Sequence, residues 1–185
     1  MMGEKSKVVL LTVNNNDKLV GALKLEKENN PEDLIIALVK MGNSVSLPTD
    51  IYEYADVVFT DLESDLDEVQ RIMDNLINGS NLMPIEAEDI YNLFSCANRP
   101  IKMARCLVKN PADIQGLVDI IAKEKEITNI AVFFVGKEEN ISVDSIMEAG
   151  DQIAEQISPE ANCLMCAIIV DDVEDDVQFV IDVMY

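Results

Sequence analysis

The feature that most restricts the fold is a continuous apolar run, ITNIAVFFVG, at residues 127–136. Its β-branched and aromatic residues predict a central strand, because a strand buried on both faces shows no polar alternation. Two later runs, ANCLMCAIIVDD and DDVQFVIDVMY, predict two more strands joined by an acidic turn around Glu174. Between them and the first run, ISVDSIMEAGDQIAEQI predicts a helix that begins at Ser142. That helix is expected to bury Val143, Ile146, Met147, Ile153 and Ile157.

Shorter apolar runs upstream predict three more strands, at residues 8–13, 55–60 and 99–110. A helix is predicted over residues 30–42, with Asn30 as N-cap, Pro31 at the first helical position and Gly42 as C-cap. The stretch LVGALKLE before it fits either a second strand or a short helix.

Three further helices are predicted between residue 64 and residue 125. In SDLDEVQRIMDNLING one face carries Leu66, Val69, Met73, Leu76 and Ile77, and Gly79 ends the helix. EAEDIYNLFSCAN predicts the second helix. KNPADIQGLVDIIAKEK predicts the third, capped by Asn110 and burying Ile114, Leu117, Val118 and Ile121.

This order of elements predicts an α/β fold, sandwich-like in the α+β sense, in which helices pack on the faces of a mixed sheet. Residues 63–185 are expected to form the main domain. Residues 1–62 form a small α/β segment that is either separate or part of that domain. A chain of 185 residues with 49% hydrophobic content can bury a sizeable core.

The composition excludes several classes of function. A net charge of −21 argues against nucleic acid and anionic membrane surfaces, because both select Lys and Arg patches. The chain has no histidine, which removes the commonest general base and most zinc and haem sites. No apolar run is long enough for a signal peptide or a membrane span. We therefore predict a cytoplasmic protein without catalytic residues, cofactor or metal.

Cys163 and Cys166 form a C-x-x-C, a spacing used in zinc and redox sites. The motif leads into AIIV, which is strand sequence, whereas a redox C-x-x-C normally precedes a helix. Residues three apart on a strand point to opposite faces, so the two thiols cannot share a metal on a regular strand. Burial of both sulfurs in the core is the favoured interpretation, and a zinc site completed by Cys96 and Cys106 or a redox site remains an alternative.

The C-terminal elements carry a resemblance to a known family. Gly136 ends a strand, the helix VDSIMEAGDQIA follows, and then come SPEAN, the acidic pair Asp171 and Asp172, and the DDV at residues 175–177. This order resembles the C-terminal domain of FtsZ, the tubulin-like cell-division GTPase of bacteria and archaea. With DEVQRIMDNLINGSNLMPIEAEDIYNLF upstream, the resemblance runs from Asp67 to Tyr185, about two thirds of the chain.

The resemblance also shows what is missing. The family's GTP-binding half needs a loop of the GGGTGTG type, whose N–H groups cradle phosphates at a helix start. This chain has seven glycines and none are clustered. In the family's synergy loop, N-x-D-x-x-D, the matching residues here are Pro84, Glu86 and Asp89. GTP hydrolysis is therefore not expected. Glu86, Glu88 and Asp89 are a candidate interaction loop, or simply the acidic first turn of a helix.

Three functions stay open from the sequence. The first is a non-catalytic FtsZ-like module that binds a protein partner or itself. The second is a small-molecule protein or enzyme with an anion site at a subunit interface, for which Arg99 and Arg105 are the candidate residues and an exposed strand edge is the plainer explanation. The third is a metal or redox protein that uses the cysteines.

Overall fold

The computed structural model divides the chain into two compact units, and each is described by itself. Unit 1 comprises Met1–Met73 and Ala87–Lys102, and unit 2 comprises Asp74–Glu86 and Met103–Tyr185. The structure describes the whole chain except residues 1–7, 14–15, 32, 42–46, 62–63, 79–84, 86, 96, 98, 125–126 and 175. At residues 8, 10, 13, 16, 17, 77, 78 and 87 it describes the backbone alone. The domain boundary predicted between residues 62 and 63 stays a prediction.

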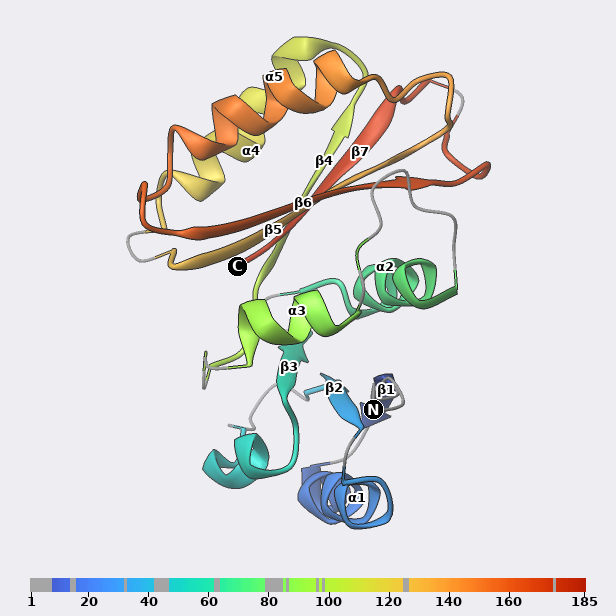
Figure 1. Ribbon diagram of the computed structural model, residues 1–185, viewed down its shortest axis with the longest axis vertical. Coiled ribbons are helices and arrows are strands. Elements are labelled where there is room, and N and C mark those ends of the chain that lie inside the picture. Colours follow the sequence, from blue (N-terminus) through green and yellow to red (C-terminus); the bar gives the residue numbers. More distant parts are fainter. Residues whose placement is uncertain are drawn as a thin grey trace, which may run out of the picture. The chain divides into compact units, whose positions relative to one another are not determined.

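Unit 1 is built on a parallel sheet in the order β1-β2-β3. Its strands are Val8–Val13 (β1), Leu34–Val39 (β2) and Val57–Thr60 (β3). Helix α1 (Asn16–Asn29) joins β1 to β2, and the 3₁₀ turn η1 (Thr49–Glu53) lies before β3 (Figure 1). Both pack on one face of the sheet in a buried cluster of Leu19, Leu23, Ile35, Ala37, Val39, Ile51 and Val58. The arrangement explains why β2 is apolar along its whole length.

The helix predicted over residues 30–42 is wrong, because this stretch contains β2. All residues of β2 except the first are buried, and a short apolar run fits a buried strand as well as a buried helix. Asn30 and Pro31 instead form the turn that closes α1. The Asn30 N–H donates to the Glu26 carbonyl at 2.9 Å, and the Asp33 N–H donates to the Asn30 carbonyl at 3.1 Å. LVGALKLE belongs to α1, which is the helical alternative, and Gly42 lies outside the described residues.

Two helices follow β3 along the chain. Helix α2 (Leu66–Asn78) buries the predicted face, whose described residues are Leu66, Val69, Met73 and Leu76; the side chain of Ile77 and all of Gly79 are outside the described residues. Helix α3 (Ala87–Phe94) buries Ile90 and Phe94. After α3, Ile101 forms a parallel bridge beside Phe59 of β3, and its N–H donates to the Val58 carbonyl at 2.8 Å.

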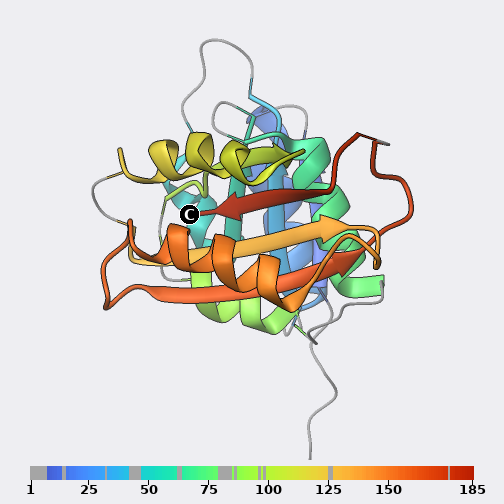
Figure 2. The same ribbon diagram turned by 90° about the horizontal axis from the view of Figure 1, so that it is seen from above.

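Unit 2 is built on a mixed sheet in the order β4-β7-β5-β6. The strands are Met103–Val108 (β4), Phe179–Met184 (β7), Asn129–Gly136 (β5) and Asn162–Ile169 (β6). Strand β7 is antiparallel to both neighbours, and β5 is parallel to β6. Helices α4 (Ile114–Ile121) and α5 (Val143–Ala154) lie side by side over one face (Figures 1 and 2). Their core includes Leu117, Ile121, Val132, Phe134, Ile153, Ile181 and Val183.

The helix starts of unit 2 follow the sequence signals. The Asn110 side chain accepts the Ala112 N–H at 3.2 Å, in the turn η2 (Pro111–Asp113) that leads into α4. The Ser142 hydroxyl accepts the Ser145 N–H at 3.1 Å at the start of α5. Both predicted N-caps are confirmed.

The predicted buried face of α5 is only partly correct. Ile153 is fully buried and Ile146 and Ile157 are partly buried, but Val143 is 71% exposed and Met147 is 60% exposed. The sheet covers the stripe made by Ile146, Ala149, Gly150 and Ile153. The apolar face of the helix is wider than the surface that covers it.

The predicted α/β class with helices on sheets is confirmed. The strands divide between two sheets, however, where the sequence predicted a single mixed sheet. In the described part of the chain, no helix has the length and apolar character that a membrane crossing requires.

Candidate functional site

A cavity in unit 1 lies where its parallel strands end. It has a volume of about 260 Å³ and is lined by Lys40, Asp61, Ser64, Asp65, Leu66 and Asp67. Lys40 directly follows β2, Asp61 directly follows β3, and Leu66 begins α2. In open α/β sheets this carboxyl edge is where ligands bind, since successive strand-to-helix loops converge there. It is therefore the candidate ligand site of this unit.

Hydrogen bonds hold this edge in place. The Asp61 carboxylate accepts the Met41 N–H at 2.8 Å. The buried Ser64 hydroxyl donates to the Ile101 carbonyl at 2.9 Å. The Asp65 carboxylate accepts the Glu68 N–H at 3.2 Å and so caps the start of α2. These hydrogen bonds fix the loops after β2 and β3 and the start of α2 at the carboxyl edge of the sheet.

The electrostatics of this cavity are unfavourable for phosphate. Three of the lining residues are aspartates, and Lys40 is the basic residue among the described lining. The Lys40 ammonium lies 3.5 Å from the Asp67 carboxylate. This ion pair weakens the attraction of Lys40 for an incoming anion. A helix start attracts anions through its free N–H groups, but here Asp65, Asp67 and Glu68 already supply carboxylates at the start of α2.

The predicted acidic loop is described only in part. Glu88 and Asp89 are exposed in the first turn of α3, whereas Pro84 and Glu86 lie outside the described residues. Carboxylates in a first helical turn stabilise the helix dipole, so the structure agrees with the plainer explanation of this motif. An interaction role for Glu86, Glu88 and Asp89 stays a prediction.

The two arginines predicted for an anion site belong to different units. Arg99 is an exposed residue of unit 1, and Arg105 lies in β4 of unit 2. Arg105 is opposite Asp182 of β7 in the register, and its Nε is 3.7 Å from the Asp182 Oδ1. Arg105 therefore pairs with a fully buried carboxylate of the chain itself, and this pairing does not support an anion site for an external ligand. Asp182 was not among the predicted site residues, although a lone acid within the apolar stretch FVIDVM indicates a buried charge.

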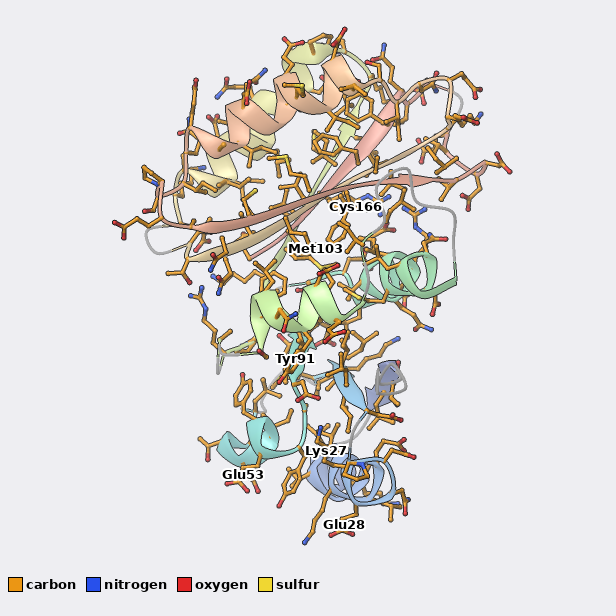
Figure 3. The ribbon with its side chains drawn as sticks, in the orientation of Figure 1. Lys27, Glu28, Glu53, Tyr91, Met103 and Cys166 are labelled. Carbon is orange, nitrogen blue, oxygen red and sulfur yellow. The ribbon has the colours of Figure 1, made fainter. Side chains whose placement is uncertain are left out.

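The C-x-x-C lies within the regular strand β6. Met165 and Ala167 belong to the cluster beneath α4 and α5, so Cys163 shares their face and Cys166 (Figure 3) lies on the other. Cys166 is fully buried, and burial raises the pKa of its thiol to about 11. Cys163 is exposed, which contradicts the prediction that both sulfurs lie in the core.

The other cysteines do not extend this motif within the described residues. The Cys106 thiol donates to the Asp113 carbonyl at 3.3 Å, and Cys96 lies outside the described part of the chain. Among the described residues, no group of three or more Cys, Asp and Glu side chains is arranged to hold a metal ion.

Comparisons with known proteins give the fold. A mutant of FtsZ from M. jannaschii aligns with 97% of this chain and 64% of its own, with a TM-score of 0.67 and 11% identity. An empty FtsZ dimer from M. jannaschii covers 97% and 62%, with a TM-score of 0.65 and 11% identity. CetZ from Methanosaeta thermophila strain DSM 6194 covers 96% and 60%, with a TM-score of 0.64 and 10% identity. The chain has an FtsZ-like fold.

The FtsZ-like fold includes the N-terminal part of the chain. The sequence resemblance ran from Asp67 to Tyr185, but the structural alignments take in almost all residues, including those of the parallel sheet. The prediction of a C-terminal domain alone was therefore too narrow. The chain spans less than two thirds of the length of these FtsZ and CetZ structures. No family model matches the sequence, and no curated protein matches it significantly.

Proposed function

We propose that this protein is a non-catalytic FtsZ-like module that acts in the cytoplasm through contacts with a protein partner or with itself, without GTP hydrolysis. The observation that carries the proposal is the acidic cavity at the carboxyl edge of the parallel sheet. A nucleoside triphosphate placed there would meet the carboxylates of Asp61, Asp65 and Asp67. Like charges repel, so these carboxylates disfavour phosphate binding at this edge.

The sequence supports the same conclusion from another direction. Phosphate loops need clustered glycines, because only glycine lets several N–H groups approach one phosphate group closely. The glycines of this chain are dispersed, and the segment after β1 reads NNND. At the positions that match the family's synergy loop, Pro84 stands in place of Asn and Glu86 in place of the first Asp. Both halves of a GTPase site would therefore be defective.

The charge of the chain bears on the contacts that the module makes. A net charge of −21 favours partners with complementary basic patches and slows association with other acidic surfaces. One of the similar FtsZ structures is described as a dimer. Self-assembly of this chain would require an interface in which its acidic groups stay at the rim.

The experiment that tests this proposal is nucleotide binding. We would titrate fluorescently labelled GTP with the protein up to about 100 μM, with and without Mg²⁺, beside an active FtsZ as positive control. We expect no saturable signal from this chain. Sedimentation velocity over the same concentrations would measure self-association. Saturable GTP binding in the micromolar range would contradict the proposal and return the chain to the nucleotide-binding proteins.

A further inference from the structure

Helix α5 packs closely on the sheet because its inward residues are small. Ala149 and Gly150 are both buried against the sheet. A Cβ atom added to Gly150 would lie 2.9 Å from the Met165 Sδ, which is closer than real contacts allow. Small residues therefore bring α5 down onto β6, while two of its large apolar residues, Val143 and Met147, remain exposed.

These two residues lie on the flank of α5. They are four positions apart, which places them one above the other along the helix as a short apolar stripe. Val143 is 71% exposed and Met147 is 60% exposed, the highest values among the large hydrophobic residues of the described chain. Exposed apolar residues at this spacing are positions through which a helix can contact the apolar face of another helix.

Carboxylates border this stripe on its solvent side. Asp144, Glu148 and Asp151 are exposed on the same helix. The sequence from Glu138 to Tyr185 contains no Lys or Arg, although Asp and Glu recur throughout it. No basic side chain of this segment can therefore neutralise the row. The surface combines an apolar stripe with an uncompensated negative border.

We propose that the α5 stripe, defined as Val143 and Met147 with Asp144, Glu148 and Asp151, binds a cationic amphipathic helix of another protein. The partner helix has apolar residues three or four positions apart and Lys or Arg on its flank. Its apolar face covers Val143 and Met147, while its basic flank meets the carboxylate row. The inference rests on the proposed function, since it names the surface and the class of partner through which the module acts.

A second copy of this chain is the weaker candidate for this surface. Symmetric pairing of two α5 helices would bring two carboxylate rows together, with no Lys or Arg from residues 138–185 to separate them. Like charges in an interface disfavour a partner, whereas opposite charges favour it. The charge of the stripe therefore selects a basic partner.

The test uses the full chain and a designed helical peptide of Leu and Lys, about 18 residues long, as the probe. A matched peptide of Leu and Glu controls for charge. Binding would be measured by fluorescence anisotropy against the native chain and a Val143→Ser, Met147→Ser double variant. Leu25→Ser is the matched control variant, because Leu25 is 59% exposed on α1, outside the stripe. Circular dichroism would confirm that each variant is folded.

We expect the native chain to bind the peptide of Leu and Lys with a micromolar Kd. The peptide of Leu and Glu should show no saturable binding. The double variant should weaken binding at least about tenfold, as loss of central anchors does, while Leu25→Ser leaves it unchanged. Asp144→Asn with Glu148→Gln should weaken binding and reduce its dependence on salt. No binding, or equal loss in the Leu25→Ser variant, would overturn the inference.

The two proposals fail in different experiments. If sedimentation shows a dimer that the Val143→Ser, Met147→Ser variant abolishes, the α5 stripe binds a second copy of the chain and the inferred basic partner is wrong. The proposal of a non-catalytic module that acts through protein contacts would still hold. Saturable GTP binding would contradict that proposal, independently of the result with the peptides.

Discussion

Three glycines of unit 2 have different surroundings, which makes them a matched test of local packing. A Cβ at Gly116, exposed in α4, would meet nothing within 4 Å. At Gly150 it would meet the flexible end of Met165, and at Gly136 it would lie 3.0 Å from the Phe179 Cβ and 3.3 Å from the Gln178 carbonyl oxygen. The contacts at Gly136 involve the Phe179 Cβ at the start of β7 and a backbone oxygen directly before it, and neither atom can move without the backbone.

We therefore expect Gly→Ala substitutions at these positions to differ in sign. Gly116→Ala should raise the free energy of unfolding by about 0.5–1 kcal/mol through helix propensity. Gly150→Ala should change it by less than about 0.5 kcal/mol, because the same gain is offset by displacement of Met165. Gly136→Ala should lower it by about 1–3 kcal/mol. Urea unfolding measures all three, and a Gly136→Ala variant as stable as the native chain would contradict the described register of β5 and β7.

At the residue level the sequence predicted geometry better than exposure. That Cys163 and Cys166 face opposite sides of a strand follows from strand periodicity alone, and the structure agrees. Which of them is exposed depends on what covers each face of β6, and no local pattern contains that information. The pairing of Arg105 with Asp182 depends on the register of β4 against β7, which joins residues far apart in sequence.

At the level of elements, local chemistry predicted helix starts, while tertiary context decided between strand and helix. The capping residues Asn110 and Ser142 act within four residues of themselves, so the sequence alone identifies them. Residues 30–42 carried similar capping signals, but the apolar run LIIALV is buried between two strands. The error on α5 has the same origin, since the width of its apolar face does not reveal how much of it the sheet covers.

The start of α4 gives a prediction that depends on pH. The Asp113 carboxylate accepts the N–H groups of Asn110 at 2.9 Å and Lys109 at 2.8 Å, and these bonds lower the pKa of Asp113 below its usual value. A lowered pKa contributes stability above the unfolded pKa, and that contribution is lost as the pH falls through the folded value. Urea unfolding of Asp113→Asn should show a loss of stability at pH 6 that shrinks as the pH falls below about 4.

The matched variant at the same turn is Asn110→Ala. It should cost about 1 kcal/mol at pH 6, and most of this loss should remain at low pH because the hydrogen bond to the Ala112 N–H involves no titrating group. The smaller part that comes from the Asn110 Nδ2–H donated to the Asp113 carboxylate at 3.0 Å should shrink as that carboxylate is protonated. A loss in Asp113→Asn that stays constant from pH 6 to pH 3 would show that the charge of Asp113 does not stabilise the turn.

At the level of the whole molecule, the sequence predicted the fold of unit 2 well and that of unit 1 poorly. The C-terminal strands are long and uninterrupted, so the order of strands and helices was enough to show the resemblance to FtsZ. The N-terminal sheet has short strands arranged in parallel, and the sequence showed no motif from which to predict it. Its residues were included only by the structural alignment, which covers 97% of this chain at 11% identity.

The excess of negative charge acts on the molecule as a whole, and it leads to the last prediction. At about 0.01 M salt the Debye length is about 30 Å, so most carboxylates of the native chain repel one another, whereas at about 0.15 M it is about 8 Å. Repulsion is stronger in the compact state than in the extended one. The melting temperature should therefore rise with NaCl.

A charge-reduced variant separates this effect from general effects of salt on protein stability. Asp171→Asn with Asp172→Asn removes two exposed charges after β6. This variant should melt above the native chain in low salt and together with it at about 0.5 M NaCl, where the lost repulsion is screened for both proteins. Differential scanning calorimetry measures both curves. If the gap between them stays constant as salt is added, the gain comes from local structure at the β6 end and the net charge of −21 does not limit stability.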